Sequence, residues 1–161
     1  MTTAELPPPT PAIVQPWQGN FEWLDILTDE SLSFDQRLDR WDAYVTQFPN
    51  VDLPLEHPFP PGMYVRKIFM PAGTIVTSRV HKFEHPFFIM QGRVSVISEN
   101  EGSVVYTAPH SGITKPNTRR FLYIHEDTVW ATVHTNPENS TDHEALLDHH
   151  TFIPTPKESL T

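Results

Sequence analysis

Two histidines four residues apart, His81 and His85, are the residues of this chain best suited to chemistry. Imidazole nitrogens bind transition metals and exchange protons near neutral pH. A His-x-x-x-His pair on a helix is a common zinc motif, but residues 74–80 are rich in β-branched side chains and Pro86 follows the second histidine directly. We therefore expect the pair to span the end of one strand and the start of the next, with both rings pointing into a shared cavity.

Two histidines alone hold a transition metal poorly, so a metal site needs a third ligand. His134 is the best candidate, because it shares one face of a predicted strand with Trp130. The sequence thus predicts a possible divalent transition metal (Fe, Mn, Zn or Ni) held by His81, His85 and His134. The alternative for His134 is a buried histidine whose ring is bonded to the backbone.

Arg79 and Arg120 suit a different ligand, a small anion, because a guanidinium forms two parallel hydrogen bonds to a carboxylate or phosphate. Arg79, Arg120 and Trp130 are therefore the candidate ligand-binding residues. In such a pocket His81 or His85 could act as general acid or base, although no catalytic residue is assigned. The structural alternative for Arg79 is an ion pair with a nearby carboxylate such as Glu84.

Eight short strands at even spacing would position these side chains. Gly, Pro and Asn-rich turns separate most of them, which is typical of a barrel or sandwich. We predict a mainly β fold, a jelly-roll barrel with one N-terminal helix and extended N- and C-terminal arms. The predicted strands are Met63–Met70, Thr74–His81, Pro86–Gln91, Arg93–Ser98, Val104–Ala108, Ser111–Thr114, Arg119–His125 and Thr128–His134.

The predicted helix covers about residues 34–48. Ser33 is a plausible N-cap, and Gln36 completes a capping box. Trp41 lies on the apolar face of this helix, which we expect to pack against the barrel. The chain then divides into a proline-rich extended arm (1–20), a helical N-terminal segment (21–60), the barrel (61–136) and a C-terminal tail that packs on the barrel surface (137–161).

Composition excludes several classes of function. The formal charge of −9 opposes binding to nucleic acid, whose phosphates would be repelled. No stretch is apolar over the ~20 residues that a membrane-spanning helix needs. The chain has no cysteine, so a metal would be held by His or carboxylate. The start of the chain does not resemble a secretory signal, and we expect a cytoplasmic protein.

Nine histidines are present, and four of them lie outside the predicted strands. We expect these four to be solvated surface residues: His57, His143, His149 and His150.

The segment from Gly73 to Gly92 resembles motif 1 of the cupins, a family of small jelly-roll barrels. The family pattern is Gly, five residues, His-x-His, three or four residues, Glu, six residues, Gly, and its spacing is unbroken here. Arg79 stands at the first His position, His81 at the second and His85 at the Glu position. The frame therefore implies a cupin fold, whereas two of the three expected ligands are substituted.

The second cupin motif matches more weakly, at residues 115–120. Asn117 stands where the family has a turn glycine, and asparagine tolerates the left-handed conformation of such a turn. Arg120 stands where the family has its fourth ligand, a histidine. The stretch 63–134 is also similar to small cupin-like proteins of tailed-phage genomes, which implies a genomic setting but no reaction.

Two functions follow from this resemblance and from the residues. The first is a single-domain cupin that binds a metal ion or a small anionic ligand in the barrel mouth. The second is a non-enzymatic phage-encoded structural or host-interaction module, whose arm 1–20 docks on a protein partner. We expect a cytoplasmic protein, located in the host cytoplasm or the virion if it is phage-encoded, and the resemblance implies a homo-oligomer.

Overall fold

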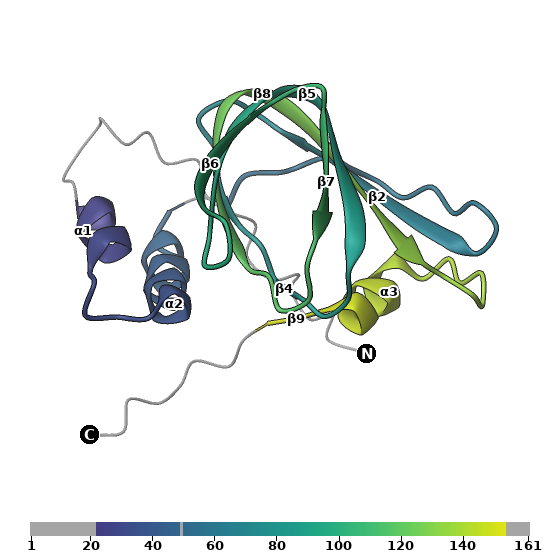
Figure 1. Ribbon diagram of the computed structural model, residues 1–161, viewed down its shortest axis with the longest axis horizontal. Coiled ribbons are helices and arrows are strands. Elements are labelled where there is room, and N and C mark those ends of the chain that lie inside the picture. The colour runs from purple at the N-terminus through teal and green to yellow at the C-terminus, as the bar shows by residue number, and fades with distance from the viewer. Residues whose placement is uncertain (1–21, 49, 154–161) are drawn as a thin grey trace.

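The computed structural model describes residues 22–48 and 50–153, and β-strand is the most abundant secondary structure among them (Figure 1). The predicted arm 1–20 and the end of the predicted tail lie outside the described residues. The elements in chain order are α1 (Glu22–Thr28), α2 (Phe34–Val45), β1 (Leu55–Glu56), β2 (Met63–Met70), β3 (Ile75–Thr77), β4 (Val80–His81), β5 (His85–Ser98), β6 (Gly102–Thr107), β7 (His110–Thr114), β8 (Arg120–Thr135), α3 (His143–His150) and β9 (Thr151–Phe152).

Seven strands form one antiparallel sheet that curves around a common interior (Figure 1). Its order is β1-β2-β8-β5-β6, with β3 paired to β8 and β7 paired to β5, while β4 and β9 form a separate two-stranded ribbon. The predicted mainly β, jelly-roll class is confirmed. The sheet is not a closed barrel, because β1 and β6 each have a single neighbour among the described residues.

Two long bent strands replace four of the predicted short ones. β5 and β8 pair along most of their length, and their register shifts between Ile89 and Val94. Gly92 lies in this bend with a φ of +95°. A Cβ atom at Gly92 would lie 2.4 Å from the carbonyl oxygen of Asp127, so only glycine allows the two strands to approach here. The turn signal of Gly92 therefore marks a bend within a strand.

The helix α2 begins as predicted, with a full capping box between Ser33 and Gln36. Helical structure ends at Val45, three residues earlier than predicted, where the chain continues into a turn. The ring of Trp41 packs edge-on against Phe121 of β8, with their centroids 5.4 Å apart. The predicted packing of this helix on the sheet is confirmed.

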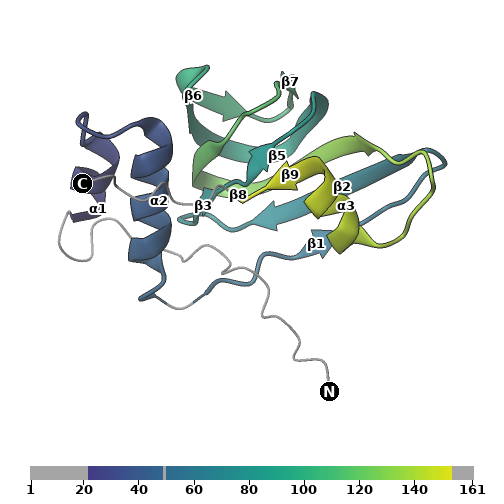
Figure 2. The same cartoon turned by 90° about the horizontal axis from the view of Figure 1, so that it is seen from below.

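The structure has more helix than was predicted. α1 precedes α2, so the N-terminal segment holds two helices, as Figure 2 shows. The C-terminal segment is not an extended arm over residues 143–152, because it forms α3 and then β9, which pairs with β4. Asp142 caps α3 by accepting a hydrogen bond from the backbone of Ala145. No helix in the described ranges is long and apolar enough to cross a membrane.

The interior of the curved sheet is apolar toward one end. The strands alternate, so that one face of each lines this interior. The buried residues of this core are Leu53, Met70, Val76, Phe87, Ile89, Val94, Val96, Leu122, Ile124 and Trp130. Polar side chains occupy the same inward faces where β5 begins and β8 ends, and they form the candidate site.

Candidate functional site: a buried cluster of histidine and arginine

Four histidines from four elements meet at this polar end. The ring centroids of His81 and His85 lie 4.7 Å apart, and those of His85 and His134 lie 4.4 Å apart. His150 of α3 extends the row, at 4.8 Å from His134. The structure thus brings together the three histidines that the sequence singled out, and adds a fourth.

His150 was predicted to be a solvated surface residue, and that prediction is wrong. The side chain is buried, and its Nε2–H donates to the carbonyl oxygen of Thr135 at 3.0 Å. The signal in the sequence was the i, i+4 spacing of Leu146 and His150, which are the two buried residues of α3. This spacing is informative only if residues 143–150 all belong to one helix, whereas the sequence suggested a single helical turn.

The other three histidines expected at the surface have mixed environments. His143 and His149 are exposed, as predicted. His57 is half-buried, because its ring stacks on His143 at 4.0 Å and bonds the hydroxyl of Tyr64 at 2.8 Å.

Burial keeps the clustered imidazoles neutral. It lowers the pKa of His81 to about 3, with smaller contributions from the neighbouring His85, Arg120, Arg66 and His150. Burial likewise lowers the pKa of His134 to about 2. The pKa of His85 is also lowered, chiefly by burial. At neutral pH these rings therefore offer one N–H and one lone pair each.

Two ring nitrogens of the cluster have unused hydrogen-bonding capacity. The Nδ1–H of His85 donates to the carbonyl oxygen of Phe83 at 3.0 Å, which leaves Nε2 as the lone-pair nitrogen. Within the described residues, this Nε2 and the Nδ1 of His81 are both buried without a hydrogen-bond partner. Buried polar atoms are nearly always paired, so both nitrogens are available to a water molecule or a ligand. In His134, by contrast, Nε2 is bonded to the hydroxyl of Thr132 at 2.9 Å.

Arg120 enters the cluster from the start of β8. Arg120 is 3% exposed, and its Nη1 donates a hydrogen bond to the hydroxyl of Thr114 at 2.9 Å. Thr114 is the cross-strand partner of His85, so the guanidinium lies beside the histidines. The guanidinium carbon also lies 5.0 Å from the ring centre of Phe87. Among the described residues no carboxylate pairs with Arg120, and its buried Nε has no hydrogen-bond partner.

A second arginine, Arg66, was missed in the sequence. It lies on the face of β2 that includes the buried Tyr64 and Met70, directly across from Thr132 of β8. Burial lowers its pKa, and its charge in turn contributes to the lowered pKa of His81. The sequence held a signal for this position. Side chains alternate between the two faces of a strand over residues 63–70, which places Arg66 on the same face as the inward-pointing Tyr64 and Met70.

Arg79 and Trp130 have structural partners. The Nη1 of Arg79 lies 2.8 Å from a carboxylate oxygen of Asp148, so this arginine ties α3 to the sheet. An ion pair was the structural alternative for Arg79, but its example, Glu84, pairs instead with Lys115. Trp130 is a core residue that stacks on Phe87 with ring centroids 4.8 Å apart, and its ring centre lies 5.9 Å from the guanidinium of Arg120.

A cavity of about 250 Å³ opens onto the cluster between the start of β5, the end of β8 and α3. His85, His134 and His150 line it together with Met63, Phe83, Glu84, Pro86, Val133 and Thr135. In the described part of the chain, no three His, Asp or Glu side chains have the arrangement of a metal site. The donor chemistry fits a metal only in part, through the two unpaired nitrogens of His81 and His85.

The sequence matches no protein-family profile and no curated protein. Solved structures with a similar fold include a cupin-2 domain-containing protein from Shewanella frigidimarina (TM-score 0.44, 8% identity, covering 68% of this chain and 99% of that one). An RmlC-like cupin with a double-stranded β-helix fold from Methanocaldococcus jannaschii has a TM-score of 0.45 and 12% identity, over 54% of this chain and 84% of that one. Both of these neighbours are cupins, and their likeness to this chain concerns the fold alone.

Proposed function

We propose that this protein binds a small organic or inorganic anion at the polar end of the curved sheet, between Arg120 and the histidine cluster. The proposal rests on the buried guanidinium of Arg120, which forms no ion pair with a described carboxylate and is compensated only from a distance, by Glu101. A buried ion costs several kcal/mol unless an opposite charge accompanies it. A bound anion supplies that charge, and Arg66 adds a second positive charge near the same histidines.

The histidines restrict which anion fits. Because the Nε2 of His85 carries a lone pair, it accepts a hydrogen bond and would repel a bare carboxylate oxygen. The ligand therefore needs both an anionic group for Arg120 and an O–H donor for His85. A hydroxycarboxylate or a monohydrogen phosphate has both. The cavity of about 250 Å³ beside His85 and His134 has room for a ligand of this size, although Arg120 does not itself line it.

A divalent transition metal is the second candidate, and the unpaired nitrogens of His81 and His85 favour it. These two residues would hold the ion, and His134 would become a third ligand if its Nε2 no longer bonded the hydroxyl of Thr132. A bound metal would supply Lewis-acid chemistry. We rank it below the anion, because the positive charges that lower the pKa of His81 and His134 also oppose a metal cation.

Thermal unfolding of the full chain separates the two candidates. We expect glycolate and phosphate, but not zinc or manganese chloride, to raise the melting temperature, since a ligand that binds only the folded state stabilises it. Arg120→Met should abolish the shift. Arg93→Met is the matched control, because Arg93 is exposed and pairs with Glu126 at the surface. A shift produced by the metals alone and lost in His81→Ala would instead establish the metal site.

A further inference from the structure

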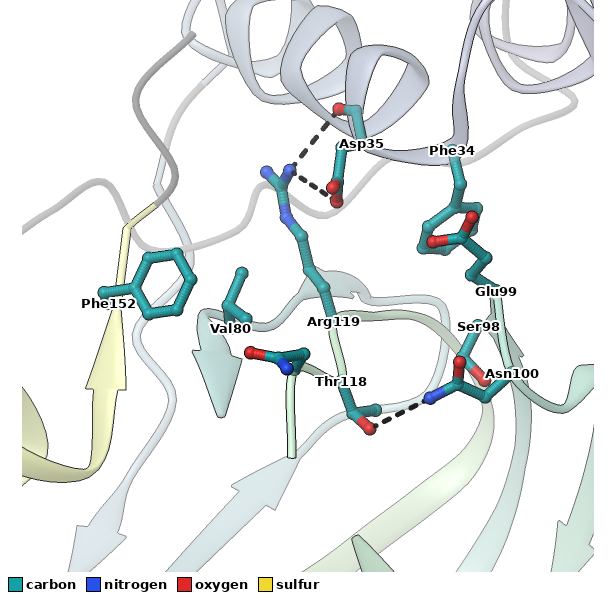
Figure 3. A pocket seen from close by; sticks show the side chains of 10 residues that line it. Phe34, Asp35, Val80, Ser98, Glu99, Asn100, Thr118, Arg119 and Phe152 are labelled. Atoms are coloured by element: carbon teal, nitrogen blue, oxygen red, sulfur yellow. Dashed lines mark hydrogen bonds and ion pairs between the residues drawn. The ribbon is translucent and has the colours of Figure 1, made fainter. Parts of the chain in front are cut away.

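A second cavity of about 250 Å³ lies where the segments flanking the sheet meet its rim (Figure 3). α2 supplies one wall, β4 and β9 supply the opposite side, and the turns after β5 and before β8 complete it. This rim pocket shares no lining residue with the histidine cavity. Phe34, Asp35 and Phe152 come from elements that flank the sheet, and the remaining lining residues come from β4, the end of β5 and the adjoining turns. Because the two cavities have separate linings, the two ligands can be tested independently.

Aromatic rings flank the rim pocket on two sides. Phe34, the first residue of α2, and Phe152 of β9 lie on either side of Arg119, as Figure 3 shows. Phe152 is 41% exposed, although it belongs to a paired strand. Val80 adds apolar surface between them. These side chains suit a short aliphatic stem, and ring faces attract a cation through their quadrupole.

The charge of the rim pocket is negative, although its floor is an arginine. Arg119 is 5% exposed, and it donates to the carboxylates of Asp39 and Asp42 at 2.9 and 2.8 Å. A third carboxylate, that of exposed Asp35, lies 3.7 Å from the same guanidinium. One positive charge thus faces three negative ones, and both Nη atoms of Arg119 already donate to carboxylates, those of Asp39 and Asp42, which lie outside the lining of the pocket.

Glu99 increases this excess of negative charge. It is exposed on the turn after β5 and lines the pocket, on the side of Phe34 in Figure 3. No described side chain forms an ion pair with Glu99. The amide side chains of Asn100 and Asn117 also line the pocket and provide carbonyl oxygens as acceptors. Carboxylates, amide oxygens and ring faces together select a cationic donor.

We propose that the rim pocket binds an organic cation, a primary amine or guanidinium at the end of a short aliphatic chain. The stem packs between Phe34 and Phe152, and the charged head lies against two exposed carboxylates: that of Glu99, which has no ion-pair partner among the described residues, and that of Asp35, which lies 3.7 Å from Arg119. A free amine and a lysine or arginine side chain of a protein share this chemistry.

NMR titration of the full ¹⁵N-labelled chain tests the proposal, with pentylamine as the probe and 1-pentanol as its neutral counterpart of the same length. We expect pentylamine to bind saturably and at least tenfold more tightly than 1-pentanol, with shifts at the lining residues. Glu99→Gln and Phe152→Ala should each weaken the amine at least threefold. Glu138→Gln, which removes an exposed acid outside the pocket, should leave its affinity unchanged.

Equal binding of the amine and the alcohol, or equal effects of Glu99→Gln and Glu138→Gln, would overturn the proposal. Agmatine and a capped Gly-Arg-Gly peptide distinguish the two sources of the cation, since tighter binding of the peptide points to a protein side chain. Arg120→Met should change none of these affinities. Failure of the rim pocket and failure of the anion site are therefore separate results.

Discussion

Replacing Arg120 by methionine tests whether the fold or a ligand balances the buried charge. The guanidinium has one hydrogen bond, to Thr114, and lies over the rings of Phe87 and Trp130. Methionine has an unbranched stem of similar reach, and its sulfur packs well against aromatic rings. Arg120→Met therefore removes the charge while it fills most of the same space.

The expected change in the free energy of unfolding is the difference between the interactions that Arg120→Met removes and the desolvation cost that it relieves. The lost hydrogen bond is worth about 1 kcal/mol, and the lost cation–π contact about 1–2 kcal/mol. Against these stands the desolvation of a charge that is 3% exposed, which costs several kcal/mol. Replacing buried ions by apolar residues is often neutral or stabilising by about 1–4 kcal/mol. We expect Arg120→Met to raise the free energy of unfolding by about 1–2 kcal/mol in the absence of ligand.

Urea unfolding at pH 7.5 in a buffer free of phosphate and carboxylates measures this change. Arg93→Met is the control, because its surface ion pair at 3.8 Å should contribute less than about 0.5 kcal/mol. A decrease of about 3 kcal/mol or more in the free energy of unfolding of Arg120→Met would contradict this prediction. It would mean that the folded chain already balances the charge of Arg120, which would then need no anion.

Three further predictions concern stability, each measured by urea unfolding. The pKa values of about 3 for His81 and about 2 for His134 lie below the 6.5 of the unfolded chain. Protons therefore bind the unfolded state first, and stability should fall by about 2 kcal/mol per histidine between pH 7.5 and pH 5. Replacing both by glutamine should flatten this profile, and an unchanged slope would contradict it. Gly92→Ala should cost about 3 kcal/mol or more, because a Cβ there meets backbone at 2.4 Å, whereas Gly102→Ala, with open space around it, should cost about 1 kcal/mol. Arg119→Met should destabilise by about 3 kcal/mol, since it leaves the half-buried carboxylates of Asp39 and Asp42 on α2 without their cation; a neutral effect would show that this cluster does not fix α2.

Local signals in the sequence predicted several features that the structure has. The spacing from Gly73 to Gly92 depends on backbone conformation, and both glycines have positive φ values, of 83° and 95°. Asn117, expected at a left-handed turn, has a φ of 63°. The capping box that begins at Ser33 and the buried face around Trp41 are equally local. Such features were predictable because each depends on a few neighbouring residues.

Features that depend on distant segments were not predictable in the same way. His150 belongs to the cluster only because α3 turns back onto the end of β8, where Thr135 accepts its hydrogen bond. Asp148 reaches Arg79 through the same contact between distant segments. The role of Arg66 depended on the register of β2 against β8, and a shift of one residue would have turned it outward.

Isothermal titration of glycolate and phosphate into the full wild-type chain measures directly whether the cluster binds an anion. We predict saturable binding of one anion per chain, and no binding to Arg120→Met. The contradicting result is an absence of anion binding up to millimolar concentrations, together with stoichiometric zinc binding that requires His81 and His85. The cluster would then be a metal centre, and Arg120 a structural residue beside it.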